Sequence, residues 1–156
     1  MTPPALVPVG GGALALTHRP RRNAFAAWKA SGVTHVVTLL TEREAARDIG
    51  EAVTNAGLRW LWIPMDGAKV PDAARTEELL PALDEIAGIL VRGGRVVVHC
   101  SAGIHRTGMF GYALLRRLGL VPEEAHAMLV ALRVETAAGV GAERLAWGDN
   151  VARTNG

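Results

Sequence analysis

The sequence predicts an α/β domain with a mostly parallel central sheet flanked by helices. Three short apolar segments, rich in β-branched or aromatic residues, are typical of buried strands; they span Val33 to Leu40, Leu58 to Ile63 and Arg95 to His99. Between them lie segments whose apolar residues recur at helical spacing, and several of these stop at a glycine. Because strands alternate with helices, we expect parallel pairing and helices on both faces of the sheet.

The first two helices can be placed by their start and stop signals. One is expected from Asn23 to Ser31 and the next from Glu42 to Ala56, each followed by a glycine. Thr41 and Glu44 have the spacing of a capping box, in which the two residues satisfy each other's free backbone donors. The second helix should therefore begin directly after Thr41.

Three further helices follow along the chain. One ends before Gly93, and Pro81 is expected to mark its first turn or to kink it. Another covers residues 107–118, and a further one begins at Pro122, where two glutamates follow at the positive end of the helix dipole. The apolar N-terminal stretch, residues 1–16, lacks a basic segment and is interrupted by proline and glycine, so it is expected to be a leader into the fold and not a secretion signal.

Composition limits the classes of protein that the chain can represent. With 156 residues, 49% of them hydrophobic and 21% charged, residues 1–156 are expected to form a single globular domain. The net charge of +2 does not favour nucleic acid as a partner, and no apolar run approaches the ~18 residues of a membrane span. One cysteine excludes internal disulfides and Cys-rich zinc sites, which favours the reducing cytoplasm.

That cysteine lies in the stretch HCSAGIHRTG, residues 99–108, between a predicted strand and a predicted helix. Ligands of open α/β sheets bind at the carboxyl ends of strands, which is where this loop is expected. Successive backbone N–H groups can curl around an anion in front of a helix N-terminus, and Gly103 gives the backbone the freedom to do so. The expected phosphate-binding residues are Ser101, Ala102, Gly103, Ile104, His105 and Arg106.

The side chains of this loop suit nucleophilic chemistry on a phosphate. The positive field of the helix N-terminus and of Arg106 favours the thiolate of Cys100, which is the nucleophilic form. The planar guanidinium of Arg106 can hold two phosphate oxygens. The hydroxyl of Thr107 can reach back to the sulfur and stabilise it as a leaving group. The alternative is a buried core cysteine that lies beside a surface arginine.

The stretch resembles the signature loop of the cysteine-dependent protein phosphatases. The matching residues, in order, are His99, Cys100, Gly103, Arg106, Thr107 and Gly108. From about Ala13 to the last helix the chain is similar to the compact dual-specificity type, in which the strand before the loop and the helix after it are also present. His105 departs from the pattern, because glycine is usual there; atypical members that act on inositol pyrophosphates share this histidine but pair it with a lysine, where this chain has Ile104.

The resemblance also implies a general acid on a separate loop. The sequence IPMDGAKVPD, residues 63–72, follows a predicted strand and is similar to the acid loop of small dual-specificity phosphatases. Asp66 is therefore the expected general acid. Asp72 is the alternative, although it is also well placed to cap the helix that follows.

By this resemblance the chain is a cysteine-dependent phosphomonoester phosphatase that forms a phosphocysteine intermediate. The catalytic residues implied are Cys100, Arg106, Asp66 and Thr107, with no metal and no organic cofactor. Its implied partner is a phosphorylated protein, with phosphotyrosine first and phosphoserine or phosphothreonine as further candidates, or a small phosphomonoester. Two alternatives stay open: a phosphatase of the same fold that acts on inositol phosphates or other small molecules, and a non-catalytic phosphate-binding module.

Three other features remain ambiguous at the level of sequence. His99 could tune the thiolate through hydrogen bonds, as its counterpart does in the family, or be a satisfied core histidine. Trp60 and Trp62 lie two apart on a strand and share a face, which we expect to be packed. The basic segment 18–22 is expected to be a solvated turn, with attraction of acidic substrates as the alternative.

Overall fold

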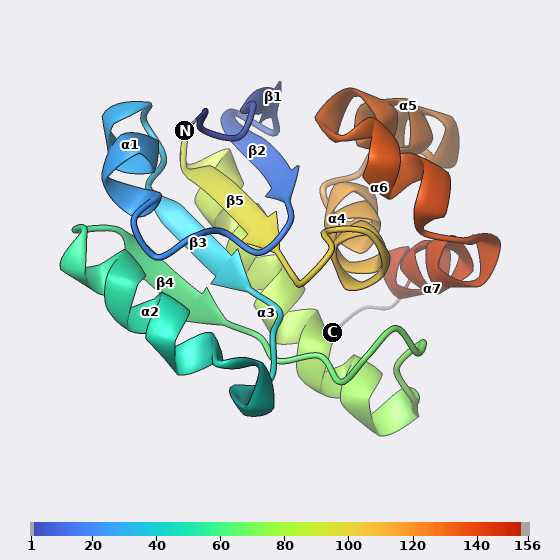
Figure 1. Cartoon of the computed structure of the whole chain (residues 1–156). Helices are drawn as coiled ribbons and strands as arrows, with labels where there is room; N and C mark the ends of the chain where they lie inside the picture. Colours follow the sequence, from blue (N-terminus) through green and yellow to red (C-terminus); the bar gives the residue numbers. More distant parts are fainter. Residues whose placement is uncertain (1, 154–156) are drawn as a thin grey trace.

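A computed structural model describes residues 2–153 and contains one five-stranded sheet in the order β1-β2-β5-β3-β4 (Figure 1). β2, β5, β3 and β4 pair in parallel, and β1 pairs with β2 in the antiparallel direction. The predicted α/β class and mostly parallel sheet are confirmed. The strands are β1 (Val7–Val9), β2 (Gly12–Thr17), β3 (His35–Thr38), β4 (Arg59–Trp62) and β5 (Arg95–His99).

The central strand is β5, and the loop that begins with Cys100 follows its carboxyl end. Val96, Val97 and Val98 are all fully buried, as expected for a strand covered on both faces. In the register of the sheet, Val98 lies opposite Leu16 of β2 and Val37 of β3. The start of the loop is thereby fixed to two neighbouring strands.

Helices cover both faces of the sheet, as the sequence predicts. α1 and α2 lie on one side, and α3 lies with the group α4 to α7 on the other (Figure 1). Gly57, Gly93 and Gly119 follow α2, α3 and α4 and have positive φ angles. The helices are α1 (Phe25–Ala30), the short 3-10 helix η1 (Glu42–Glu44), α2 (Ala46–Asn55), α3 (Ala73–Val91), α4 (His105–Arg117), α5 (Pro122–Leu132), α6 (Val134–Gly139) and α7 (Ala142–Ala152).

The prediction of one continuous helix over residues 42–56 is wrong. It is divided at Ala45, whose φ of 62° lies in the left-handed region that L-residues rarely occupy. The capping box is nevertheless confirmed, because the amide of Thr41 donates to Oε1 of Glu44 at 3.0 Å. The first turn therefore forms a separate unit, which carries the Glu44 carboxylate.

Two other expectations need correction. α3 begins at Ala73, so Pro81 lies well inside the helix and does not mark its first turn. The N-terminal stretch 1–16 is expected to be a leader, but within it Val7–Val9 form strand β1. Pro8 is tolerated there because β1 is an edge strand, whose outer side needs no N–H donor.

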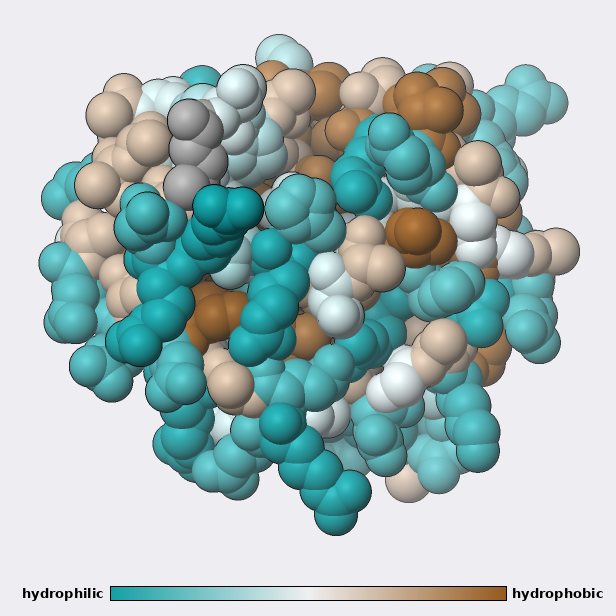
Figure 2. Space-filling model, viewed as in Figure 1, coloured by the Kyte–Doolittle hydropathy of each residue, from teal (hydrophilic) through white to brown (hydrophobic). Residues whose placement is uncertain are grey.

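The face seen in Figure 2 is mostly hydrophilic, and its hydrophobic residues lie in separate small areas. Within residues 2–153, no helix combines the length and the apolar character needed to cross a bilayer.

A glycine in α2 allows the tryptophan of the edge strand to pack. A Cβ added at Gly50 would lie 2.5 Å from the Trp60 ring, whereas one added at Gly88 of α3 would meet only the flexible end of Arg92 at 3.0 Å. Overpacking of this kind costs about 1–3 kcal/mol, and replacement of a helical glycine by alanine alone gains up to about 1 kcal/mol. We therefore expect Gly50→Ala to lower the free energy of unfolding in urea and Gly88→Ala to leave it unchanged or raise it. Equal effects would contradict this account.

Candidate active site

Cys100 lies directly after β5 and is almost completely buried, with 3% of its surface exposed. The buried hydroxyl of Thr107, in the first turn of α4, donates to its sulfur at 3.0 Å. The predicted contact between these two residues is therefore present. The sulfur lies between the end of a strand and the start of a helix, where the sequence predicts it.

The carbonyls of the loop are all occupied by partners. Those of Cys100 and Ile104 accept from the ring of His99 at 3.1 Å and the amide of Gly108 at 2.8 Å. The carbonyl of Ser101 accepts from the amide of Arg19 at 2.8 Å. The carbonyls of Ala102 and Gly103 also have partners, which are described next. All five carbonyls from Cys100 to Ile104 therefore accept hydrogen bonds.

Those two carbonyls are held from the C-terminal part of the chain. Nη1 of Arg133, between α5 and α6, donates to Ala102 at 3.3 Å and to Gly103 at 2.9 Å, and the hydroxyl of Thr136 also donates to Gly103. In a trans peptide the N–H points away from the carbonyl, so the loop amides face away from these partners. Within residues 2–153, no acceptor bonds the amides of 101–104. The loop therefore presents free donors, as an anion site requires.

Gly103 is required by this shape. Its φ of 72° lies in the left-handed region, and an added Cβ would lie 2.5 Å from the carbonyl oxygen of Thr17. The loop and the end of β2 are too close for any side chain at this position. The prediction that Gly103 serves the backbone of the loop fits this geometry.

Arg106 is held by a carboxylate that the sequence analysis did not assign to the site. Its Nη1 and Nη2 donate to Oε1 and Oε2 of Glu44 at 2.7 and 2.9 Å, and Nη1 also donates to the carbonyl of Met65 at 3.1 Å. The bonds from Glu44 and the nearby charge of Cys100 raise the pKa of Arg106 against the opposing effect of burial. The bonds from Arg106 lower the pKa of Glu44 to about 2. Both side chains are therefore charged over the whole physiological pH range.

These contacts leave one edge of the Arg106 guanidinium open. A guanidinium has five N–H donors, and the bonds to Glu44 and Met65 use three of them. The two that remain, on Nε and Nη2, lie on the same edge of the plane and have no oxygen acceptor within residues 2–153, although the Cys100 sulfur is near enough to help raise the pKa of Arg106. This side-on fork has the geometry that holds two oxygens of a phosphate.

The two aspartates of the loop 63–72 have different surroundings. Asp66 is exposed, follows Met65, whose carbonyl contacts Arg106, and lines a cavity of about 290 Å³. Asp72 lines the same cavity, but its carboxylate accepts from the amide of Arg75 at 2.8 Å and caps α3. The capping role expected for Asp72 is confirmed. Asp66 keeps a carboxylate without a hydrogen-bond partner in the described part of the chain.

The basic segment 18–22 is partly built into the site. The side chain of Arg19 is half-buried and donates to the backbone carbonyl of Glu44 at 2.6 Å, while Arg21 and Arg22 are exposed. Only the exposed part behaves as the solvated turn that the sequence predicts. Arg19 instead ties the end of β2 to the unit that carries Glu44.

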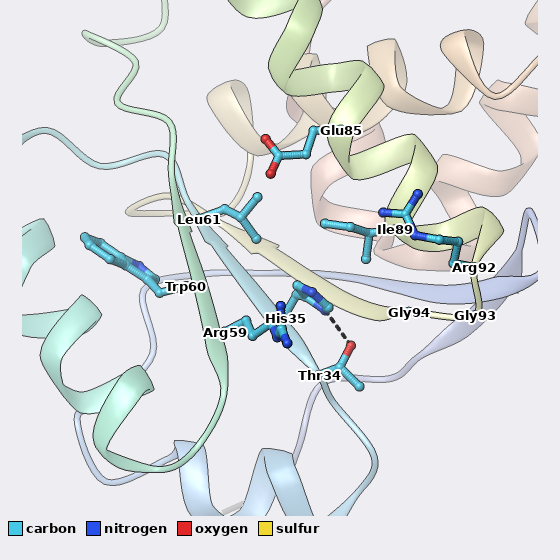
Figure 3. A pocket seen from close by; sticks show the side chains of 10 residues that line it. All are labelled: Thr34, His35, Arg59, Trp60, Leu61, Glu85, Ile89, Arg92, Gly93 and Gly94. Atoms are coloured by element: carbon cyan, nitrogen blue, oxygen red, sulfur yellow. Dashed lines mark hydrogen bonds between the residues drawn. The ribbon is translucent and has the colours of Figure 1, made fainter.

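A cavity of about 680 Å³ lies elsewhere. It is a groove between α3 and the beginnings of β3 and β4, with Leu61 and Ile89 on its walls and Arg59, Arg92 and Glu85 around it (Figure 3). Cys100 lies beyond the opposite, carboxyl ends of the strands. None of the predicted site residues lines this groove.

Within residues 2–153, no group of three or more His, Cys, Asp or Glu side chains is arranged to hold a metal ion. Two of the acidic residues near the loop already have other roles, because Glu44 binds Arg106 and Asp72 caps a helix.

Residues 11–119 match the sequence profile of a family described as polymorphic toxin system, DSP-PTPase phosphatase. The chain belongs to this family. It is therefore a phosphatase of the dual-specificity and tyrosine type, as the resemblance of residues 99–108 implies. No curated protein sequence matches the chain.

Solved structures show the same fold. The phosphatase matches Tk-PTP in its active form with a TM-score of 0.76 and 24% identity, over 99% of this chain and 100% of that one. It matches kinase associated phosphatase, KAP, with a TM-score of 0.72 and 17% identity over 99% of both chains. It also matches P. aeruginosa TpbA bound to pTyr with a TM-score of 0.57 and 20% identity, over 96% of this chain and 95% of that one.

His99, which precedes Cys100, is completely buried in the phosphatase and is bonded at both ring nitrogens. Nε2 lies 2.7 Å from the hydroxyl of Thr38, and Nδ1 lies 3.1 Å from the carbonyl of Cys100. Burial lowers the pKa of His99 from 6.5 to about 4, with a smaller contribution in the same direction from the charges of Arg19 and Arg106. The ring is therefore neutral at physiological pH.

This shift makes stability depend on pH in a defined window. Between pH 6.5 and about 4 the unfolded chain binds a proton at His99 that the folded chain does not, so stability falls as the pH is lowered. At about 1.4 kcal/mol per pKa unit, the loss approaches ~3 kcal/mol by pH 4. We expect urea unfolding to show a falling free energy from pH 7 to 5, and the NMR signals of the His99 ring to stay constant above pH 5. A ring that titrates near 6.5 would contradict the assignment.

Proposed function

We propose that the chain hydrolyses phosphotyrosine in proteins, with Cys100 as the nucleophile. One observation carries the proposal: a buried sulfur that accepts a hydrogen bond from Thr107 lies in a loop with free amides, beside an arginine with one open edge. Free amides and a guanidinium fork are the donors that a phosphate dianion needs. A thiolate among them is placed to attack the phosphorus.

In the first step the Cys100 sulfur forms a bond to phosphorus while the bond from phosphorus to the substrate oxygen breaks. The amides of residues 101–106 and the open edge of Arg106 stabilise the charge on the equatorial oxygens. Asp66 donates its proton to the departing oxygen, so the product leaves as a neutral alcohol or phenol. The phosphoryl group remains on sulfur as phosphocysteine.

In the second step water replaces sulfur on the phosphorus. The carboxylate of Asp66 takes a proton from the attacking water, a phosphorus–oxygen bond forms and the phosphorus–sulfur bond breaks. Thr107 donates to the sulfur as it regains negative charge, which stabilises the leaving thiolate. Phosphate is released and Cys100 returns to its starting state.

The substrate class rests on the family and on one relative. The structure of TpbA holds pTyr, and the family consists of dual-specificity and tyrosine phosphatases. We infer that phosphotyrosine proteins are the first substrates, with phosphoserine and phosphothreonine proteins as further candidates. The family description supports a place in a polymorphic toxin system.

The domain, cofactor needs and compartment of the reaction are inferred from the same residues. Residues 1–156 act as one domain, no cofactor or metal takes part in the steps above, and the lone thiol suits the reducing cytoplasm. Neither nucleic acid nor a membrane is a partner in this proposal. Turnover of a phosphotyrosine peptide, a phosphoserine peptide and inositol phosphates, measured side by side, separates the proposed substrates from the small-molecule alternative.

The nucleophile is tested by replacement of its sulfur. Cys100→Ser should abolish hydrolysis of an aryl phosphate because a serine hydroxyl is almost entirely protonated near neutral pH, while the wild type should be inhibited by vanadate and unaffected by a chelator. Full turnover by Cys100→Ser would refute the mechanism. Tight binding of a phosphopeptide by the wild type without turnover would favour the non-catalytic module.

The general acid is tested with two aspartates of the same loop. Asp66→Ala should slow substrates with poor leaving groups much more than those with good ones, because only poor leaving groups need the proton. Asp72→Ala should cost about 1 kcal/mol of stability through the lost helix cap and leave the dependence on leaving group unchanged. A series of aryl phosphates of graded leaving-group acidity measures both. The reverse outcome would assign the acid to Asp72.

A further inference from the structure

Three side chains from three adjacent strands form a hydrogen-bonded line that ends at Cys100. Nε1 of Trp60, on β4, lies 2.8 Å from the hydroxyl oxygen of Thr38, on β3. That hydroxyl lies 2.7 Å from Nε2 of His99, on β5, and Nδ1 of His99 lies 3.1 Å from the carbonyl of Cys100. Thr38 and His99 are fully buried, so water does not compete for these bonds.

The protons in this line have one consistent arrangement. A carbonyl can only accept, so Nδ1 of His99 carries a proton and donates it to Cys100. The ring is neutral, so its Nε2 is an acceptor and the Thr38 hydroxyl donates to it. An indole N–H can only donate, so Trp60 donates to the Thr38 oxygen. All three bonds therefore run in the same direction, toward the nucleophile.

The last bond acts on the peptide group that follows the nucleophile. The carbonyl of Cys100 and the amide of Ser101 belong to one planar trans unit, so a carbonyl held by His99 aims that amide the opposite way. Hydrogen bonds in series also polarise one another, which makes the Ser101 amide a stronger donor. This amide is one of the free donors of the loop.

We propose that Trp60 and Thr38 are positioning residues for the loop of residues 100–104. They hold His99 with its proton on Nδ1 and thereby orient the peptide between Cys100 and Ser101. The proposal rests on the proposed function, in which this amide and this sulfur act on phosphate. Neither residue touches the substrate. Both act through His99, from as far away as the edge strand.

The neighbouring tryptophan provides a matched control. Trp62 lies on the same strand and the same face, with its ring stacked on that of Trp60 at 5.6 Å between centroids. Its Nε1 also donates one hydrogen bond, at 2.7 Å, but to the backbone carbonyl of Leu40 and not toward His99. Replacement of either indole by phenylalanine removes a similar ring area and one N–H donor. Only one of these donors belongs to the line.

The experiment compares Trp60→Phe with Trp62→Phe in the full chain, without substrate. One readout is the ¹⁵N NMR spectrum of the His99 ring, which distinguishes a proton on Nδ1 from one on Nε2. The other is the rate of Cys100 alkylation by iodoacetamide as a function of pH. In Trp60→Phe we expect mixed tautomer signals and alkylation slowed about three- to tenfold at pH 6, the size of effect expected for the loss of one hydrogen bond, with the same limiting rate at high pH. Trp62→Phe should match the wild type in both.

Two variants of Thr38 complete the test. Thr38→Val removes the hydroxyl and should change both readouts at least as much as Trp60→Phe, whereas Thr38→Ser keeps the hydroxyl and should restore them. Near-UV circular dichroism confirms that each variant is folded. The charged and titratable groups that face His99, namely Arg19, Arg106 and His18, are unchanged throughout.

Three results would overturn the proposal: equal changes in the two tryptophan variants, no change in Trp60→Phe, or a wild-type ring with its proton on Nε2. If Thr38→Val fails to fold, the comparison between Trp60→Phe and Trp62→Phe decides alone. Because neither readout involves turnover, this outcome is independent of the Cys100→Ser test. Failure of the phosphatase mechanism and failure of the positioning role are thus seen separately.

Discussion

The orientation of the peptide groups in residues 100–104 is the constraint on which the site depends. Five successive carbonyls are bonded to partners, and the amides of the same peptide units are left without acceptors. The partners come from the end of β2, from β5, from α4 and from the α5–α6 junction. Ser101 and Ala102 are exposed, so their amides are open to solvent and to an entering ligand. Each surrounding element therefore holds the loop in a shape whose amides can bind an anion.

Glu44 takes part both in the local structure of η1 and in the contacts of Arg106. Its carboxylate caps η1 through the amide of Thr41 and also binds the guanidinium of Arg106. The left-handed conformation of Ala45 separates η1 from α2, so the two do not form one continuous helix. Arg19 bonds the Glu44 carbonyl and fixes the same turn from the other side. The arginine that we propose for phosphate binding is thus oriented before a substrate arrives.

Local patterns in the sequence predicted β5, the loop around Cys100, the start of α4 to within two residues and the cap of α3, because each depends on residues close together in the chain. The Thr41–Glu44 spacing likewise predicted the capping box but not the second use of Glu44, whose partner Arg106 is 62 residues away. The contacts from Arg133 and Thr136 to Gly103 cross about 30 residues and leave no local signal. The shared face of Trp60 and Trp62 was predictable, but the bond from Trp60 to Thr38 required the register of β3 and β4.

The hydrogen bonds from Arg133 and Thr136 to the loop carbonyls determine how much of the chain the loop needs to keep its conformation. The family profile stops at residue 119, after every residue of the signature stretch. A chain cut at that point would keep the sulfur, the arginine and the acid loop, yet two loop carbonyls would lose their donors. Their peptide planes would then be free to rotate, and carbonyl oxygens would compete with amides for the space around the sulfur. The segment matched by the family profile is therefore shorter than the segment needed to hold the loop in this conformation.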